Sequence, residues 1–173
     1  HSNLERLKNL ANNTLSNDVG NNEGIAASIY FKSLFGKHFV RDRLGDDVNL
    51  LLNYTYIVLR AIVARAVAGN GLLPQLSLKH CSAANPIPLV DDLIEPFRAV
   101  ADKFVFEELN KLINIDHIEL TPAIKRSLTQ IISYPVQTNK GTVSLSDGIY
   151  DFVASLVKCF EAKKLCLEYP KIL

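Results

Sequence analysis

The 173-residue sequence contains no methionine, no tryptophan and only three cysteines. Because even an initiating methionine is missing and the chain begins His1-Ser2, we expect a fragment of a longer protein. Cys81, Cys159 and Cys166 are odd in number and form no CxxC pair. This pattern favours neither a disulfide framework nor a zinc ribbon, and a reducing cytosol fits it best.

A strong charge of either sign is also missing, because the formal net charge is +1. Composition therefore does not indicate a nucleic-acid partner, which would need basic residues gathered on one face. Apolar residues are plentiful: 48% of the chain is hydrophobic, enough at this length for a substantial core. The sequence shows no internal repeat and no linker, so we expect a single domain over residues 1–173.

Apolar residues at helical spacing predict three helices before the glycines of 69–71. The first carries Leu4 to Leu15, and the second begins near Asn22-Glu23 and is expected to be mostly buried. The third follows Asp46-Asp47, and its run 50–68 is apolar almost all round, which is typical of the central helix of a bundle. Residues that tolerate a positive φ then end this helix.

The third helix is long enough to raise a membrane span as an alternative. It contains Asn53, Arg60 and Arg65. Each central arginine in a lone membrane span costs about 2.5 to 3.5 kcal/mol on insertion scales. We therefore expect no membrane association.

The second half of the chain also predicts helices. One spans 88–111, and Thr121-Pro122 supplies an N-cap and a first-turn proline for another that ends near Ser133. A turn over 139–141 predicts a small hairpin within 136–145, and Ser146-Asp147 is expected to cap a last helix that runs to about Leu167. The expected fold is all-α, with about six helices.

One arc of the 88–111 helix, roughly 160° wide at about 100° per residue, is apolar. Asp91, Asp92 and Glu95 share the opposite side, and His80 precedes the helix. Carboxylates hold Mg²⁺ or Mn²⁺, and Mn²⁺ tolerates one imidazole best. Acids opposite an apolar stripe are also typical of any surface helix, so a metal site and an inert acid cluster both remain open. The stripe comprises Leu89, Val90, Leu93, Ile94, Phe97, Val100, Ala101, Phe104 and Val105.

Five motifs in order resemble those of a known family. The chain is similar to the CRISPR-associated integrase, the larger universal subunit of the spacer-acquisition machinery, and resembles its helical C-terminal domain most strongly over Leu4 to Asp102. The double acid before Leu93 and the helix start at Leu120-Thr121-Pro122 resemble the type II branch. The motifs are Glu23-Gly24-Ile25-Ala26-Ala27, Leu52-Asn53-Tyr54-Thr55-Tyr56, Gly71-Leu72-Leu73-Pro74, His80 to Asn85, and Asp91 to Arg98.

The resemblance implies a catalytic metal triad of Glu23, His80 and Glu95, which would bind Mg²⁺ or Mn²⁺. Asp92 falls where the family keeps a second acid beside the metal, and Asp91 is expected to be exposed. Further residues in the matching motifs would fix the ligands, although a capping Asn or a packed Tyr explains them equally well. These supporting candidates are Asn53, Tyr54, Asn85 and Arg98.

DNA contacts are a further expectation from the resemblance. Ser28 and Lys79 depart from the arginine and histidine that relatives often carry, and a lysine does not reproduce arginine's bidentate fork. Phosphate-binding residues would make DNA affinity salt-dependent, whereas an ordinary solvated face would not. The candidates are Lys37, Arg41, Arg43, Arg60, Arg65 and Lys79.

The family joins a short captured DNA, the prespacer, to the CRISPR repeat by transesterification with a 3′-hydroxyl. Its members have an N-terminal β-rich domain that builds a homodimer, and they work with a small partner protein in the prokaryotic cytoplasm. We expect this chain to lack the β-rich domain and therefore to integrate DNA poorly by itself. Cys81 is expected to be a packed thiol and not a nucleophile.

Two alternatives of other classes remain. The chain could be a non-catalytic helical module that binds DNA or protein and carries an inert acid cluster. It could also be a metal-dependent nuclease that cuts branched DNA without joining it. The first predicts no metal dependence, and the second predicts no ligated product.

Overall fold

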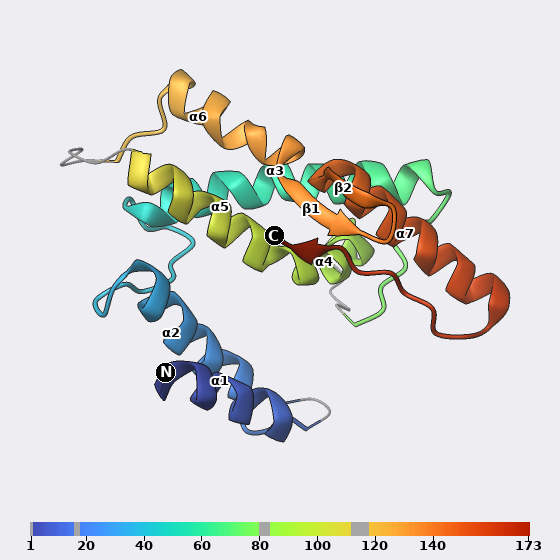
Figure 1. Ribbon diagram of the computed structural model, residues 1–173, viewed down its shortest axis with the longest axis horizontal. Coiled ribbons are helices and arrows are strands. Elements are labelled where there is room, and N and C mark those ends of the chain that lie inside the picture. Colours follow the sequence, from blue (N-terminus) through green and yellow to red (C-terminus); the bar gives the residue numbers. More distant parts are fainter. Residues whose placement is uncertain (1, 16–17, 80–83, 112–117) are drawn as a thin grey trace. The chain divides into compact units, whose positions relative to one another are not determined.

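The computed structural model describes residues 2–15, 18–79, 84–111 and 118–173. The chain forms two compact units, His1–Asn49 and Leu50–Leu173. Figure 1 labels the α-helices and the strands β1 and β2.

In the N-terminal unit, helix α1 (Ser2–Asn13) packs against helix α2 (Asn22–Phe35). The start of α2 is fixed by Asp18, whose carboxylate accepts hydrogen bonds from the backbone N–H groups of Asn22 and Glu23 at 2.8 Å each. A carboxylate at this position satisfies N–H groups that have no partner within the helix and favours the positive end of its dipole. Gly36, with φ of 104°, follows the last residue of α2.

The prediction that α2 is mostly buried was wrong, because none of its residues is buried. Within its own unit the helix packs against α1 and contributes to an aromatic cluster of Tyr30, Phe31, Phe35 and Phe39. Of these four rings only Phe39 is buried. The polar helix α1 and a few aromatic rings cover only part of α2. The small and branched residues of α2 therefore remain partly exposed.

The C-terminal unit is built around helix α3 (Val48–Gly69). The residues that α3 buries recur every three or four positions, among them Leu52, Leu59 and Val63, whereas Ile57 is 65% exposed. The helix is therefore amphipathic, not apolar on all sides. It is long and apolar enough to cross a membrane by length and composition alone, a test that core helices of soluble proteins also pass. Its C-terminus closes as predicted, with Gly71 at φ of 71°.

The predicted 88–111 helix is three consecutive segments: α4 (Pro88–Ile94), the 3₁₀ helix η1 (Glu95–Phe97) and α5 (Arg98–Lys111). The 3₁₀ turn falls at Pro96, which has no N–H to donate to the preceding turn. Every residue of the predicted apolar stripe is buried, so that prediction is confirmed. The helix type changes at Glu95, the last of the three acids on the side opposite the stripe.

Helix α6 (Pro122–Thr129) and the 3₁₀ helix η2 (Gln130–Ser133) follow the predicted Thr121 cap, whose hydroxyl accepts from the Ile124 N–H at 3.3 Å. The predicted hairpin is β1 (Pro135–Thr138) and β2 (Gly141–Ser144). A third strand, β3 (Lys171–Ile172), pairs antiparallel with the other edge of β1, giving the order β2-β1-β3 (Figure 1). Sequence analysis missed β3, because two residues carry no alternating pattern.

The last helix, α7 (Leu145–Ala162), begins and ends earlier than expected. Its cap is Ser144, not Ser146, because the Ser144 hydroxyl accepts from the Asp147 N–H at 3.1 Å. It ends before Lys163, which is left-handed with φ of 50°, so it does not reach Leu167. The fold is mostly helical with one small antiparallel sheet, as predicted in its main features.

Candidate metal centre

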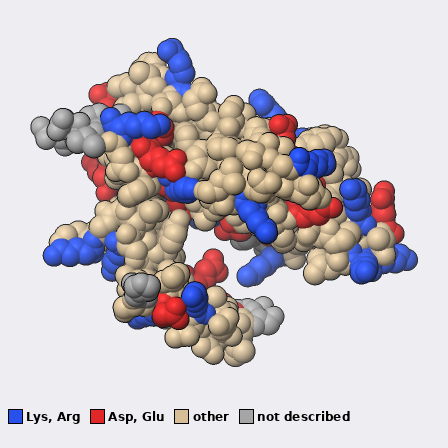
Figure 2. Space-filling view, in the orientation of Figure 1, with Lys and Arg blue, Asp and Glu red and all other residues tan. Residues whose placement is uncertain are grey.

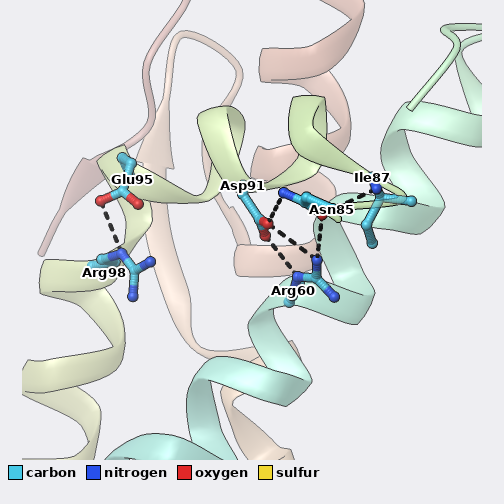
Figure 3. A network of polar contacts seen from close by, with 6 residues as sticks. All are labelled: Arg60, Asn85, Ile87, Asp91, Glu95 and Arg98. Atoms are coloured by element: carbon cyan, nitrogen blue, oxygen red, sulfur yellow. Dashed lines mark hydrogen bonds and ion pairs between the residues drawn. The ribbon is translucent and has the colours of Figure 1, made fainter. Parts of the chain in front are cut away.

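Asp91 lies within a polar network that joins α4 to α3 (Figure 3). Its two carboxylate oxygens accept from Arg60, from Nε at 2.6 Å and from Nη2 at 3.1 Å. Asn85 Nδ2 also donates to Asp91 at 2.7 Å, and Asn85 Oδ1 accepts from the Ile87 N–H at 3.1 Å. The hydrogen bond with Asp91 raises the pKa of Arg60 above its usual value, although burial acts against it.

The expectation that Asp91 is exposed was therefore wrong. Its side chain is 28% exposed, and its carboxylate is held in a bidentate ion pair. A planar guanidinium donates two parallel hydrogen bonds to one carboxylate, which fixes both groups in orientation. Asp91, Arg60 and Asn85 together tie the segment before α4 to the central helix.

Asp92, the neighbouring acid, holds the other end of that connecting segment. Its Oδ2 accepts from the backbone N–H of Leu78 at 2.6 Å and of Lys79 at 3.0 Å. A carboxylate that accepts two backbone N–H groups clamps the main chain at that point. The clamped residues directly precede His80, which lies outside the described residues.

Glu95 presents its carboxylate at the 3₁₀ turn, where its side chain is 43% exposed. Arg98 Nε donates to Glu95 Oε2 at 2.8 Å (Figure 3). The guanidinium of Arg98 lies over the ring of Tyr56, 5.0 Å from its centroid, and the Tyr56 hydroxyl donates to the buried carboxylate of Asp102. Burial lowers the pKa of Arg98, but Glu95 and Tyr56 together outweigh it and the net pKa is raised.

Tyr56 and Asp102 were missed by sequence analysis, although Tyr56 belongs to one of the motifs that carry the resemblance. The signal was available in part, because Tyr56 lies three residues after Asn53 on the same face of a helix. The sequence contains no signal for Asp102, since a single acid within an amphipathic helix is ordinarily solvated. It is 2% exposed here.

Glu23 belongs to the N-terminal unit, in the first turn of α2, and is exposed. Within residues 2–15, 18–79, 84–111 and 118–173, no group of three or more His, Cys, Asp or Glu side chains is close enough to hold a metal ion. His80, the predicted imidazole ligand, falls in one of the gaps. The triad of Glu23, His80 and Glu95 thus stays a prediction.

The donors that are described suit a hard divalent cation. Glu23 and Glu95 both have exposed carboxylates. Asp92 anchors the main chain that leads into the one imidazole of the proposed set. Two carboxylates and one imidazole match the preferences of Mn²⁺, and Mg²⁺ would keep more of its water.

The other predicted supporting residues divide into two pairs. Asn85 and Arg98 each contact an acid of the 88–111 segment. Asn53 and Tyr54 are half-buried on α3. The role of all four residues in fixing the metal ligands stays a prediction.

The predicted DNA-binding cations differ in what they already contact. Arg60 is bound to Asp91, and Arg41 Nη1 donates to Asn49 Oδ1 at 2.9 Å and to the Asp42 carbonyl at 2.8 Å. Arg43, Lys37, Arg65 and Lys79 lie at exposed positions. Figure 2 shows Lys and Arg interspersed with Asp and Glu over the face drawn, with no large area of one sign.

Comparison with known proteins identifies a family of CRISPR adaptation proteins. Residues 1–128 match the family model described as CRISPR associated protein Cas1. The chain is 42% identical over 174 residues, 98% of its length, to the CRISPR-associated endonuclease Cas1 of Neisseria meningitidis serogroup C (strain 8013). It is 33% identical over 126 residues, 67% of its length, to the CRISPR-associated endonuclease Cas1 1 of Francisella tularensis subsp. novicida (strain U112). The chain belongs to the Cas1 family.

The chain spans 55% of the length of the Neisseria relative and 40% of that of the Francisella relative. Among solved structures, a casposase bound to integration product matches with a TM-score of 0.71 over 87% of this chain and 52% of that one, at 22% identity. At that identity the likeness concerns the fold. It agrees with a mostly helical architecture for this chain.

Proposed function

We propose that this chain is the C-terminal catalytic region of a CRISPR integrase, which joins a prespacer to the CRISPR repeat by attack of a 3′-hydroxyl on a phosphodiester. The observation that carries the proposal is the arrangement around α4. Asp92 clamps the two residues before His80, and Glu95 follows three residues after Asp92. In a chain of the Cas1 family, this arrangement supports a metal site made by His80 and Glu95.

The proposed ligands are Glu23, His80 and Glu95, with Mg²⁺ or Mn²⁺ as the resident cation. A divalent cation there would supply Lewis-acid polarisation of a phosphoryl oxygen and a lower pKa for a bound hydroxyl. The chain's own residues would orient the metal ligands. Asp92 fixes the main chain entering His80, and Arg98 directs the Glu95 carboxylate while Tyr56 and Asp102 hold Arg98 in turn.

Double-stranded DNA is the proposed substrate, in the form of a prespacer and a CRISPR repeat. Support comes from the fold it shares with a casposase whose structure contains an integration product. Lys37, Arg65 and Lys79 are exposed and are the stronger candidates for phosphate contact, and Arg43 is a further exposed candidate. Arg41 and Arg60 already donate to internal acceptors, so we assign them primarily to holding their own segments.

The whole protein is proposed to add an N-terminal β-rich domain, which builds a homodimer, and to act with a small partner subunit in the prokaryotic cytoplasm. The type II branch is our proposal for its subtype. This chain alone is expected to bind the metal and to integrate DNA poorly or not at all. Efficient integration by the 173-residue chain would contradict that expectation.

The proposal is tested by titrating the chain with Mn²⁺ and measuring the free ion by electron paramagnetic resonance. We expect Glu23→Gln, His80→Gln and Glu95→Gln each to weaken binding by at least about tenfold, since each removes a ligand. Glu161→Gln is the matched control, because Glu161 is an exposed acid on α7. Circular dichroism of each variant checks that it folds.

Equal Mn²⁺ affinity in Glu95→Gln and Glu161→Gln would contradict the metal site. That result would favour the alternative of a non-catalytic helical module, for which the existing Glu95–Arg98 ion pair is the supporting observation. Cleavage of branched DNA without any ligated product, in the longer protein with its partner subunit, would favour a nuclease instead of an integrase.

A further inference from the structure

The last residues of the chain fold back over α7 as a docked C-terminal tail, defined here as residues 163–173. The reversal begins at the left-handed Lys163, and the backbone N–H of Lys164 donates to the Cys159 carbonyl at 3.2 Å. Figure 1 shows this segment leaving the end of α7 and returning to lie beside β1. The tail therefore adds β3 to the edge of β1 that does not pair with β2.

Several contacts hold the tail in place. The Glu168 N–H donates to the hydroxyl of the buried Ser155 at 3.0 Å, and Asn139 Nδ2 donates to Glu168 Oε2 at 2.7 Å. The Tyr169 ring lies 5.0 Å from the buried Phe152 ring, centroid to centroid. Lys103 Nζ also donates to the carbonyl of Leu173, and two residues of β3 pair with β1.

Gly148 on α7 marks how closely the tail approaches. A Cβ at this position would lie 2.9 Å from Val136 Cγ2 and 3.4 Å from Pro170 Cβ. A side chain here would push against the strand on one side and the tail on the other. The glycine permits the close approach of both to α7.

Two thiols face each other where the tail begins. Cys159 is half-buried near the end of α7, Cys166 is exposed in the tail, and their sulfurs are 3.3 Å apart. The backbone N–H of Cys166 also donates to Cys159 Sγ at 3.1 Å. The pKa of Cys166 is raised mainly by its hydrogen bond with Cys159, to which burial and the nearby charges of Cys159 and Glu168 add.

We propose that Cys159 and Cys166 form a redox-modification site, in which a small-molecule disulfide of the glutathione class converts the two thiols to a disulfide that fastens the tail to α7. The sulfurs need to close from 3.3 Å to about 2.0 Å, which is within reach of side-chain rotation in an exposed segment. Disulfides of proteins in reducing compartments are usually transient and redox-sensing, which suits an exposed pair.

The exchange proceeds in two balanced steps. One cysteine thiolate attacks a sulfur of the small disulfide, forms a mixed disulfide and releases one small thiolate. The second cysteine thiolate attacks the protein sulfur of the mixed disulfide, forms the Cys159–Cys166 bond and releases the second small thiolate. The small disulfide gains two electrons, and the two protons lost by the cysteines end on the two released thiols.

The consequence is a tail that opens less often. In the reduced chain the tail can leave β1 by swinging about Lys163, whereas the disulfide keeps Cys166 beside α7. The following residues, including those of β3, then stay close to their partners. We expect the backbone amide of Glu168, which donates to Ser155, to exchange hydrogen about tenfold more slowly in the oxidised chain, since the cross-link removes part of the freedom of the open tail.

The test equilibrates the 173-residue chain with glutathione buffers from fully reduced to fully oxidised, then alkylates the remaining thiols and measures the intact mass. The reduced chain should take three alkyl groups and the oxidised chain one, on Cys81. Cys159→Ser and Cys166→Ser should each abolish the intramolecular disulfide. Cys81→Ser is the control and should leave it unchanged.

Peptide mapping must then show a link between Cys159 and Cys166. A bond that includes Cys81, a glutathione that stays attached to Cys166, or three free thiols in fully oxidised buffer would each overturn the proposal. Hydrogen exchange of the tail supplies the second readout. Equal exchange rates in the oxidised and reduced chains would show that the disulfide does not fasten the tail.

Discussion

Helices α2 and α3 both contain many apolar residues, yet they differ in burial. Helix α3 buries a continuous face that includes Leu59 and Val63, whereas α2 buries no residue. The difference lies in what surrounds each helix inside its own unit. Helix α3 is joined to α4 by the Arg60–Asp91 pair and to α5 by the Tyr56–Asp102 bond, while α2 packs against the polar helix α1.

The two units therefore depend on different interactions. The C-terminal unit is held by apolar packing, with buried residues from each of its longer helices. The N-terminal unit contains a small aromatic cluster and a buried amide, Asn49, which is 2% exposed. Apolar composition predicts that a segment is helical, but its burial depends on the surfaces that the rest of the unit supplies.

The largest effect is expected from Phe152→Ala. Phe152 is 2% exposed, and its ring meets Phe97 edge to face at 5.3 Å. Removing a buried ring of this kind costs about 3 to 5 kcal/mol in the free energy of unfolding. Phe31→Ala, in the half-open aromatic cluster, should cost about 1 to 2 kcal/mol because part of the ring already contacts solvent. Urea unfolding followed by circular dichroism compares the two, and equal losses would contradict the comparison.

Asn49→Ala should destabilise the N-terminal unit by about 2 kcal/mol, since it removes several hydrogen bonds made by a buried amide. Asn49 Oδ1 accepts from Arg41 and from the Asp42 N–H at 2.9 Å each, and its Nδ2 donates to the Val40 carbonyl at 3.0 Å. The control is Asn13→Ala, which removes an exposed amide that donates to a single carbonyl. The comparison is made by thermal unfolding. A loss no greater than that of the control would show that this network does not stabilise the unit.

Glu108→Gln tests a buried charge in the C-terminal unit. Burial raises the pKa of Glu108, but hydrogen bonds from Lys111 and Ser127 outweigh it and hold the pKa below the usual value of 4.5. Such a carboxylate contributes stability above its unfolded pKa and loses it as the pH falls through the lower folded value. We expect Glu108→Gln to cost about 1 kcal/mol at neutral pH and progressively less below about pH 4.

The measurement for Glu108 is urea unfolding of both chains at a series of pH values. Glu161→Gln, at an exposed position, is the matched control. A stability difference that stays constant through the acidic range would contradict the lowered pKa.

The smallest effect is expected from Arg60→Lys. The pair with Asp91 is partly solvated, with side chains 40% and 28% exposed, so we expect a loss of about 1 kcal/mol or less. A lysine cannot donate two parallel hydrogen bonds to one carboxylate. Arg65→Lys on the exposed side of α3 should be neutral. A double-mutant cycle with Asp91→Asn measures the coupling, and zero coupling would remove this link between α3 and α4 from the account.

Much of the helical frame could be predicted from local signals. The apolar stripe from Leu89 to Val105 and the cap at Thr121 depend on spacing and on neighbouring residues, and both were confirmed. The ion pair of Asp91 could not be predicted, because its partner Arg60 is 31 residues away in sequence. The capping of α7 by Ser144 depends on where β2 ends, which the sequence of the cap does not specify.

In the candidate site, too, some features follow from local sequence and others depend on contacts between residues distant in sequence. The resemblance supplied Glu23, His80 and Glu95 as expected ligands, and the matching motifs supplied Asn53, Tyr54, Asn85 and Arg98 as residues expected to fix those ligands. The clamp that Asp92 forms on the Leu78 and Lys79 amides depends on the path of an irregular segment, which no periodicity predicts. The support of Arg98 by Tyr56 also required the packing of two helices.

The most direct test of the central claim is the anomalous scattering of a crystal of this chain soaked in Mn²⁺. We expect one strong peak, contacted by carboxylate oxygens of Glu23 and Glu95 and by the imidazole of His80. A crystal in which Mn²⁺ binds elsewhere, while these three side chains point away from one another, would contradict the proposed metal centre.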